Sequence, residues 1–345
     1  MAIVIGILLA ISFGVCIWLF QSRRHPAGLV PYPSSEQQER ILVEHALKFL
    51  LEAEQDGNIA STEQLERRLG LSAGAGKQLE EALAERGLLD RAGGSGEPVL
   101  RLTPNGRDYA RHVIRTHRLW EKYLADHTGL DESEWHIRAD SLEHELTPEQ
   151  TDRLAARLGH PTHDPHGDPV PSLLWKETAS KGRPLESLEP GQGARILHIE
   201  DEPTHVFRRI AAKCLAPGMT VRLISRSEEG CLIETEGRRE HLSREEAANI
   251  TVGDPLPKDQ VSTGMVPLSC LAPGRKAVVR IVSRALRAPE RRRFLDLGLV
   301  PGTQVTVELP APSGDPVAYR IRGTLVALRR DQAAHVLVEL LPEAA

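Results

Sequence analysis

Residues 133–146 read SEWHIRADSLEHEL, a stretch whose polar side chains are spaced like one face of a helix. On a helix, His136, Asp140, Glu143 and His144 occupy i, i+4, i+7 and i+8, an arc of about 100°. Two imidazoles and two carboxylates on one face are costly to bury unless a cation lies among them. The stretch therefore predicts a metal site in a helical domain.

The preceding helix, expected over 105–127, carries a second group of metal-ligand types. His117 and Glu121 form an i,i+4 pair at the border of its apolar face. The chain has 14 histidines but 4 cysteines, and the cysteines form no CxxC pair. Imidazoles and carboxylates without thiolates favour Mn(II) or Fe(II), with Zn(II) also possible. No nucleophile is assigned, so we expect a binding protein rather than an enzyme, with an open hydrolytic metal site as the alternative.

The same helix presents a basic stripe. Its members, which share an arc of about 80°, are Arg107, Arg111, Arg115, Arg118 and Lys122. The stripe indicates contact with nucleic-acid phosphates, although a solvated charged face has the same pattern.

The region before this helix, 38–107, has the pattern of a winged helix-turn-helix. A helix is expected over 39–54, a second after a cap at Ser61 or Thr62, and a third around Leu79 and Leu83. Two short strands around a glycine-rich tip follow. This order is that of a DNA-reading module, and a small helical adaptor is the alternative.

The expected recognition helix is more acidic than such helices usually are. Glu80, Glu81 and Glu85 outnumber Lys77 and Arg86, so DNA binding is predicted to be weak or lost. The residues predicted to contact DNA are Ser72, Lys77, Gln78, Arg107, Arg111 and Arg115.

The second half of the chain repeats itself. LEPG at 188–191 and LAPG at 215–218 recur as LAPG at 271–274 and LVPG at 299–302. Alternating Val, Ile and Thr between glycine turns predict two small β-barrels, over 185–254 and 265–342. A linker over 173–184 is expected before the first barrel, after a helical domain over 108–172.

The first residues predict a membrane anchor. Positions 2–20 carry no charge and, as a helix, match the ~30 Å hydrocarbon layer. Arg23 and Arg24 follow, which predicts a single-pass protein of the inner (cytoplasmic) membrane with the bulk of the chain in the cytoplasm. The expected architecture is multidomain α+β: a transmembrane helix over 1–21, a linker over 22–37, and the four domains above.

Three motifs carry a family resemblance. THRLWE (116–121), DSLEH (140–144) and HDPHGDPVP (163–171) resemble the metal-binding and dimerisation domain of the DtxR/MntR family of iron- and manganese-dependent repressors. The likeness covers about 38–172. Both predicted barrels resemble the FeoA/SH3-like domain. The resemblance implies a homodimer that binds operator DNA when loaded with Mn(II) or Fe(II).

The resemblance also implies two ligand sets. The primary set is His45, Asp140, Glu143 and His144. The ancillary set is His117, Glu121 and His136, with Glu202 and His205 of the first barrel as possible additions. His45 stands where the family usually has Met or Asp, and Asp140 where it has Cys or Glu.

The expected function is a membrane-tethered, metal-dependent transcriptional regulator. The alternative is an inner-membrane accessory protein of ferrous-iron or manganese uptake, in which the FeoA-like domains touch a transporter and the winged helix is a relic. A metallohydrolase is the third possibility.

Overall fold

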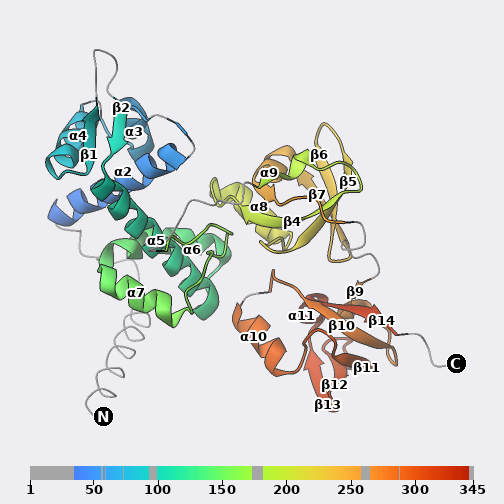
Figure 1. Ribbon diagram of the computed structural model, residues 1–345. Helices are drawn as coiled ribbons and strands as arrows, with labels where there is room; N and C mark the ends of the chain where they lie inside the picture. Colours follow the sequence, from blue (N-terminus) through green and yellow to red (C-terminus); the bar gives the residue numbers. More distant parts are fainter. Residues whose placement is uncertain are drawn as a thin grey trace, which may run out of the picture.

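The computed structural model describes residues 35–55, 57–58, 60–72, 74–92, 99–172, 182–257, 265–286 and 288–341. The predicted anchor, at 1–21, lies outside these residues, as does most of the linker that follows it. Within the described part of the chain, no helix is both long enough and apolar enough to cross a bilayer. The helices from blue to green in Figure 1 form one half of the molecule, and two β-rich units form the other.

The predicted winged helix-turn-helix is present. Its elements are α2 (Ser35–Gln55), α3 (Thr62–Leu69), α4 (Ala75–Glu85), β1 (Leu89–Ala92) and β2 (Val99–Leu102). Ser61 caps α3 in a capping box with Gln64, and the two strands pair antiparallel. Leu47, Leu65 and Leu83 are fully buried at the centre of its core, which is why the three helices pack on one another.

The helical domain follows without a break. It consists of α5 (Pro104–His127), α6 (Glu132–Leu142), the 3-10 turn η1 (Glu143–Glu145) and α7 (Pro148–Arg157). The domain boundary expected at residue 107 falls inside α5, which therefore joins the two units rigidly. The helix expected over 133–146 ends at Leu142, and its last ligand candidates lie in the 3-10 turn.

Each of the two predicted β-rich units forms a six-stranded sheet. The first contains β3 (Arg183–Pro184), η2 (Leu185–Ser187), β4 (Gly193–Ile199), α8 (Thr204–Ala212), β5 (Thr220–Arg226), β6 (Gly230–Thr235), β7 (Arg238–Ser243), α9 (Arg244–Ala248) and β8 (Ile250–Val252). Its strand order is β3-β8-β4-β5-β6-β7. Alternate residues of β5, such as Val221 and Leu223, point into its core.

The second unit repeats this topology. It contains β9 (Val266–Pro267), η4 (Leu268–Cys270), β10 (Lys276–Val282), α10 (Ala288–Asp296), β11 (Gln304–Pro310), β12 (Val317–Ile321), β13 (Thr324–Leu328), α11 (Arg330–Ala334) and β14 (Val336–Leu340). Read from its other edge, its strand order, β13-β12-β11-β10-β14-β9, equals that of the first unit. The sequence repeat is therefore a structural repeat.

The loop over 163–170 docks the helical domain on the first barrel. The Ile199 amide donates to the His166 carbonyl at 3.0 Å. Gly167 adopts a φ of 100°, and a Cβ there would lie 2.0 Å from the carbonyl oxygen of Leu197. Only glycine lets this loop approach β4 so closely, and the close approach brings the barrel to the ligand candidates of α5 and α6.

Candidate metal centre

Four side chains, from α5, α6, the loop over 163–170 and the first barrel, gather around the Glu121 carboxylate of α5. Glu121 Oε1 lies 3.0 Å from His117 Nε2, 3.1 Å from His136 Nδ1 and 3.7 Å from His166 Nδ1. Asp201, just beyond β4, completes the group, because its Oδ2 lies 2.8 Å from His136 Nδ1 and 3.6 Å from His166 Nδ1. We call these five residues the Glu121 cluster.

The protonation of these imidazoles reflects the two carboxylates. Burial would lower the pKa of His136, but hydrogen bonds with Asp201 and Glu121 raise that pKa to about 10. Burial likewise opposes the charged form of His166, and Glu121 raises its pKa to about 9. For His117 the charge of Glu121 overrides burial and holds the pKa well above its usual range. Three imidazoles around one carboxylate thus bind protons that a divalent cation would displace.

The donor set fits a divalent metal ion. Three imidazoles and two carboxylates suit Mn(II), Fe(II) or Zn(II). Among the described residues, His166 Nε2 is buried and has no hydrogen-bond partner. All of these residues except His166 also line a cavity of about 540 Å³ that opens between α2, α5 and the first barrel.

A second group lies between α2 and η1. His45, Glu143 and His144 offer donor atoms within 4.8 Å of one another. Glu44, which is buried, fixes His144 by contacting its Nδ1, and among the described residues His144 Nε2 has no hydrogen-bond partner, with Glu143 Oε1 3.7 Å away. We call His45, Glu143 and His144 the His144 cluster.

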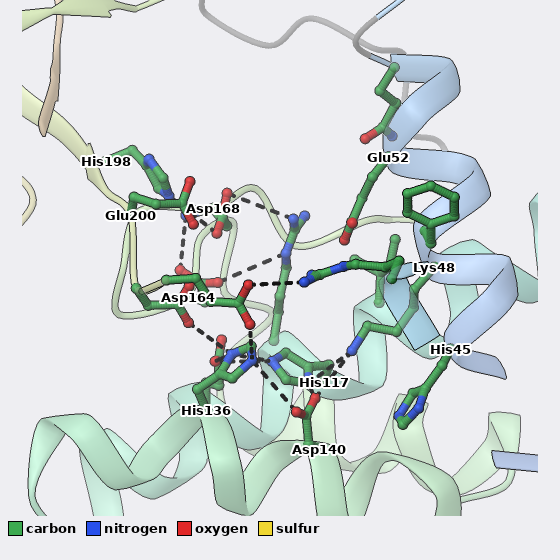
Figure 2. Close-up of a pocket in the computed structure, with 18 of the residues that line it drawn as sticks. His45, Lys48, Glu52, His117, His136, Asp140, Asp164, Asp168, His198 and Glu200 are labelled. Carbon is green, nitrogen blue, oxygen red and sulfur yellow. Dashed lines mark hydrogen bonds and ion pairs between the residues drawn. The ribbon is translucent and has the colours of Figure 1, made fainter. Parts of the chain in front are cut away.

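Asp140 is separated from the set in which the sequence placed it. Its Oδ1 lies 3.3 Å from His117 Nδ1, and its Oδ2 lies 3.6 Å from His136 Nε2. α6 ends at Leu142, so Glu143 and His144 lie in the 3-10 turn that follows the helix carrying His136 and Asp140. Figure 2 shows His136 beside His117 and Asp140 beneath His117, with His45 apart from them.

The first barrel contributes a residue that the sequence analysis missed. Glu202 was expected to assist, but its Oε1 lies 3.9 Å from His136 Nε2 and its Oε2 lies 3.3 Å from Arg68. His205 is exposed on α8 and lies 3.7 Å from Glu245. The neighbouring Asp201 makes the close contact with His136 instead. His166 was missed as well, although it lies in the quoted motif at 163–171.

The same loop holds further buried charge. Asp164 Oδ1 accepts hydrogen bonds from the amides of His166, Gly167 and Asp168, each at 2.9 Å. Burial and the neighbouring Asp168 raise the pKa of Asp164 to about 7. The Arg118 side chain donates to the Pro169 carbonyl at 2.6 Å and so ties this loop to α5.

The predicted DNA contacts are placed on two elements. Ser72, Lys77 and Gln78 are exposed at and beside the start of α4. The arginines of α5 lie in ion pairs: Arg107 with Glu54 at 2.7 Å, Arg111 with Asp108 at 3.0 Å and Arg115 with Asp152 at 2.5 Å. DNA contact by these six residues stays a prediction.

The N-terminus of α4 is occupied by a carboxylate of α3. Glu66 Oε1 accepts the amides of Gly74 at 2.9 Å and Gly76 at 3.1 Å. A Cβ at position 76 would lie 2.5 Å from Glu66 Cγ, so the glycine is what lets the two helices approach. Gly76 thus makes room for this cap.

The helical fold and its clustered donors define a metal-binding module of the kind found in metal-dependent repressors. Residues 103–172 match the family described as iron dependent repressor, metal binding and dimerisation domain. Residues 183–253 and 266–340 each match the FeoA domain. The chain thus carries the metal-binding and dimerisation domain of the iron-dependent repressors followed by two FeoA domains, which confirms the resemblance for these regions.

Individual relatives agree with this assignment. The chain is 34% identical over 128 residues to the iron-dependent repressor IdeR of Mycobacterium tuberculosis, covering 37% of this chain and 54% of that protein. It is 33% identical over 127 residues to the diphtheria toxin repressor of Corynebacterium efficiens, covering 37% of this chain and 54% of that protein. The chain therefore spans about half the length of the curated relatives it matches.

A solved structure extends the similarity. The fold is similar to that of a manganese-dependent transcriptional repressor in complex with manganese, with a TM-score of 0.55 and 29% identity. That similarity covers 62% of this chain and all of the other.

Proposed function

We propose that this protein is a manganese- or iron-dependent DNA-binding transcriptional regulator of metal homeostasis that acts as a homodimer. The observation that carries the proposal is the Glu121 cluster, in which the helical domain and the first barrel supply neighbouring imidazole and carboxylate donors. The relatives that match are named as repressors, which also favours regulation over catalysis.

The cluster is connected to the winged helix by two ion pairs. Lys48 of α2 lies 3.0 Å from Glu143, which in turn contacts His117. Arg68 of α3 lies 3.3 Å from Glu202, next to Asp201. When bound, a divalent cation supplies a positive centre that holds Asp201 and the imidazoles together. The two ion pairs then fix α2 and α3 against this ordered cluster, which favours one orientation of α4.

Metal selectivity follows from the donor types. Nitrogen and oxygen donors without thiolate suit Mn(II) and Fe(II), whereas affinity alone ranks Zn(II) above both. Metal availability in the cell therefore selects between them.

The direct test is metal-dependent DNA binding by the purified chain. An operator is selected from a random DNA pool with Mn(II) present, and affinity is then measured by fluorescence anisotropy with Mn(II) and with chelator. We expect tight binding only with Mn(II). The gain in DNA affinity caused by Mn(II) should vanish in Glu121→Gln and persist in Glu145→Gln, which removes an exposed carboxylate of η1. Failure to select any sequence while Mn(II) is bound would reject the proposal.

The membrane tether is a separate part of the proposal. It rests on the uncharged stretch at 2–20 and the arginines that follow, all outside the described residues. Alkaline extraction of cell membranes tests it: the full chain should stay in the membrane fraction, and a chain lacking residues 1–34 should not. Release of both would remove the tether from the proposal.

A second function, an accessory role in metal uptake, is favoured by the state of α4. Its N-terminus already binds the Glu66 carboxylate, and the arginines of α5 are paired within the chain. In that case the two FeoA domains would contact a transporter. Crosslinking in cells distinguishes the two, because a regulator crosslinks to specific DNA and an accessory protein to a membrane partner.

A further inference from the structure

One lysine lies among the predicted metal ligands. Lys48 Nζ lies 3.0 and 3.2 Å from the two oxygens of Glu143, 3.3 Å from Asp140 Oδ1 and 3.5 Å from His117 Nδ1. Its side chain is only 16% exposed. In Figure 2 it reaches from α2 toward His117 and Asp140. A primary ammonium thus contacts three residues that the sequence analysis assigned to metal.

The lysine competes for the donor atoms of the His144 cluster. Glu143 supplies the carboxylate of that cluster, yet both its oxygens contact Lys48, and Oε2 also lies 2.6 Å from His117 Nδ1. A divalent ion on Glu143 would have to share this carboxylate with a fixed positive charge a few ångströms away. Coulomb repulsion opposes that arrangement, and it is strong where water is largely excluded.

The Glu121 cluster is different. Within the described part of the chain, the ion pairs of Glu121 and Asp201 are formed with histidines alone. Neutral imidazoles can bind a metal ion after losing their protons, whereas an ammonium cannot act as a ligand at all. The two clusters therefore have unequal capacity for a divalent cation.

We propose that Lys48 is a built-in cation that takes the place of a second metal ion, so that each chain binds one divalent cation, in the Glu121 cluster. Lys48 pairs with both Asp140 and Glu143 and offsets one of their two negative charges whether or not metal is bound. Because it belongs to α2, it also holds the winged helix against α6 and η1 without metal. The inference rests on the proposed function only in that the chain binds metal, and it makes no use of DNA.

The experiment measures stoichiometry. The purified full chain is dialysed against Mn(II), and bound ion is counted from the loss of the electron paramagnetic resonance signal of free Mn(II). We expect one ion per chain in the wild type and in Lys48→Arg, which keeps the charge, and two in Lys48→Gln. Lys122→Gln, which breaks a lysine–carboxylate pair with Asp126 on α5, is the matched control and should bind one.

Two further variants test the proposal if Lys48→Gln does not fold. In the wild-type background, His166→Ala should abolish binding, and His144→Ala should leave one ion bound. Three results would each overturn the proposal. They are two ions bound in the wild type, one ion bound in a folded Lys48→Gln, and loss of binding in His144→Ala but not in His166→Ala. Any of these outcomes leaves metal-dependent DNA binding intact, so the two proposals fail separately.

Discussion

His117 Nδ1 lies 2.6 Å from Glu143 Oε2, while Nε2 of the same ring lies 3.0 Å from Glu121. One imidazole therefore joins the Glu121 cluster to the carboxylate that Lys48 contacts. The ring is buried, and it lies near the middle of α5, the helix that joins the winged helix to the dimerisation domain. This ring is thus one connection between the ligands of Glu121 and α2, by way of Glu143 and Lys48.

Replacing His117 should remove metal binding. His117→Gln deletes a nitrogen donor and disturbs Glu121 and Glu143 together, so we expect affinity for Mn(II) to fall at least about tenfold. Isothermal titration calorimetry measures the change. His127→Gln, on the same helix and stacked on Tyr123, should leave the affinity unchanged. Equal affinities in the two variants would show that His117 is not a ligand.

Substitutions at neighbouring residues of the first barrel identify which of them is the metal ligand. Asp201→Asn removes the carboxylate that contacts His136 and His166, and affinity for Mn(II) should fall about 10- to 100-fold. Glu202→Gln and His205→Ala should change it little, because Glu202 lies beyond contact distance and His205 is 66% exposed on α8. If His205→Ala weakens binding more than Asp201→Asn, the sequence-based assignment is the better one.

Acid should weaken the contact between α2 and η1. Burial would raise the pKa of Glu44, but hydrogen bonds from His144, Arg40 and Tyr109 lower it to about 2 from an ordinary value of 4.5. A depressed pKa stabilises the fold fully above pH 4.5, and this contribution is lost as the pH falls toward 2. The difference corresponds to about 3 kcal/mol in the free energy of unfolding.

Glu44→Gln measures this contribution. In chelator, the variant should be less stable than the wild type at pH 7, and the difference should shrink to roughly half at pH 3. Urea titrations followed by hydrogen exchange in peptides from α2 report both values. Glu36→Gln, an exposed carboxylate of the same helix, is the control. A difference that does not change with pH would contradict the role assigned to Glu44.

Neutralising the cap of α4 should strengthen DNA binding. Glu66→Gln keeps an oxygen that accepts the amides of Gly74 and Gly76 but removes a negative charge from the helix end expected to face DNA. One charge at a helix end is worth about 0.3–1 kcal/mol, which is about two- to fivefold in affinity. Anisotropy with the selected operator measures it, and Glu63→Gln is the matched control on α3. Weaker binding in Glu66→Gln would show that this end of α4 does not face phosphate.

Local pattern was enough to predict the architecture. The cap at Ser61, the apolar spacing of α2 and the repeated LxPG turns depend on residues close together in sequence, and each predicted its element correctly. The end of α6 at Leu142 was not predicted, because an ideal helix was extended through Glu143 and His144. The resemblance grouped Asp140 with Glu143 and His144, and in the structure its carboxylate oxygens lie 3.3 Å from His117 and 3.6 Å from His136.

The missed residues share a different cause. Asp201 and His166 meet only because the loop at 163–170 docks on β4, which depends on backbone contacts between separate units. Lys48 follows His45 by one turn and resembles any solvated helix lysine until α2 packs on the helical domain. Charge balance was the available signal, since the two imidazoles and two carboxylates of α6 and η1 needed a counter-charge from elsewhere.

Strands β4 and β10 are equivalent in the two barrels. β4 ends at Ile199 and pairs with β8, and β10 ends at Val282 and pairs with β14. Two residues further on, the first barrel has Asp201 and the second has Arg284. Duplication therefore did not double the capacity for cations. One copy has a carboxylate beside the proposed metal cluster and its twin has a guanidinium at the same place, so only the first copy offers an acidic donor there.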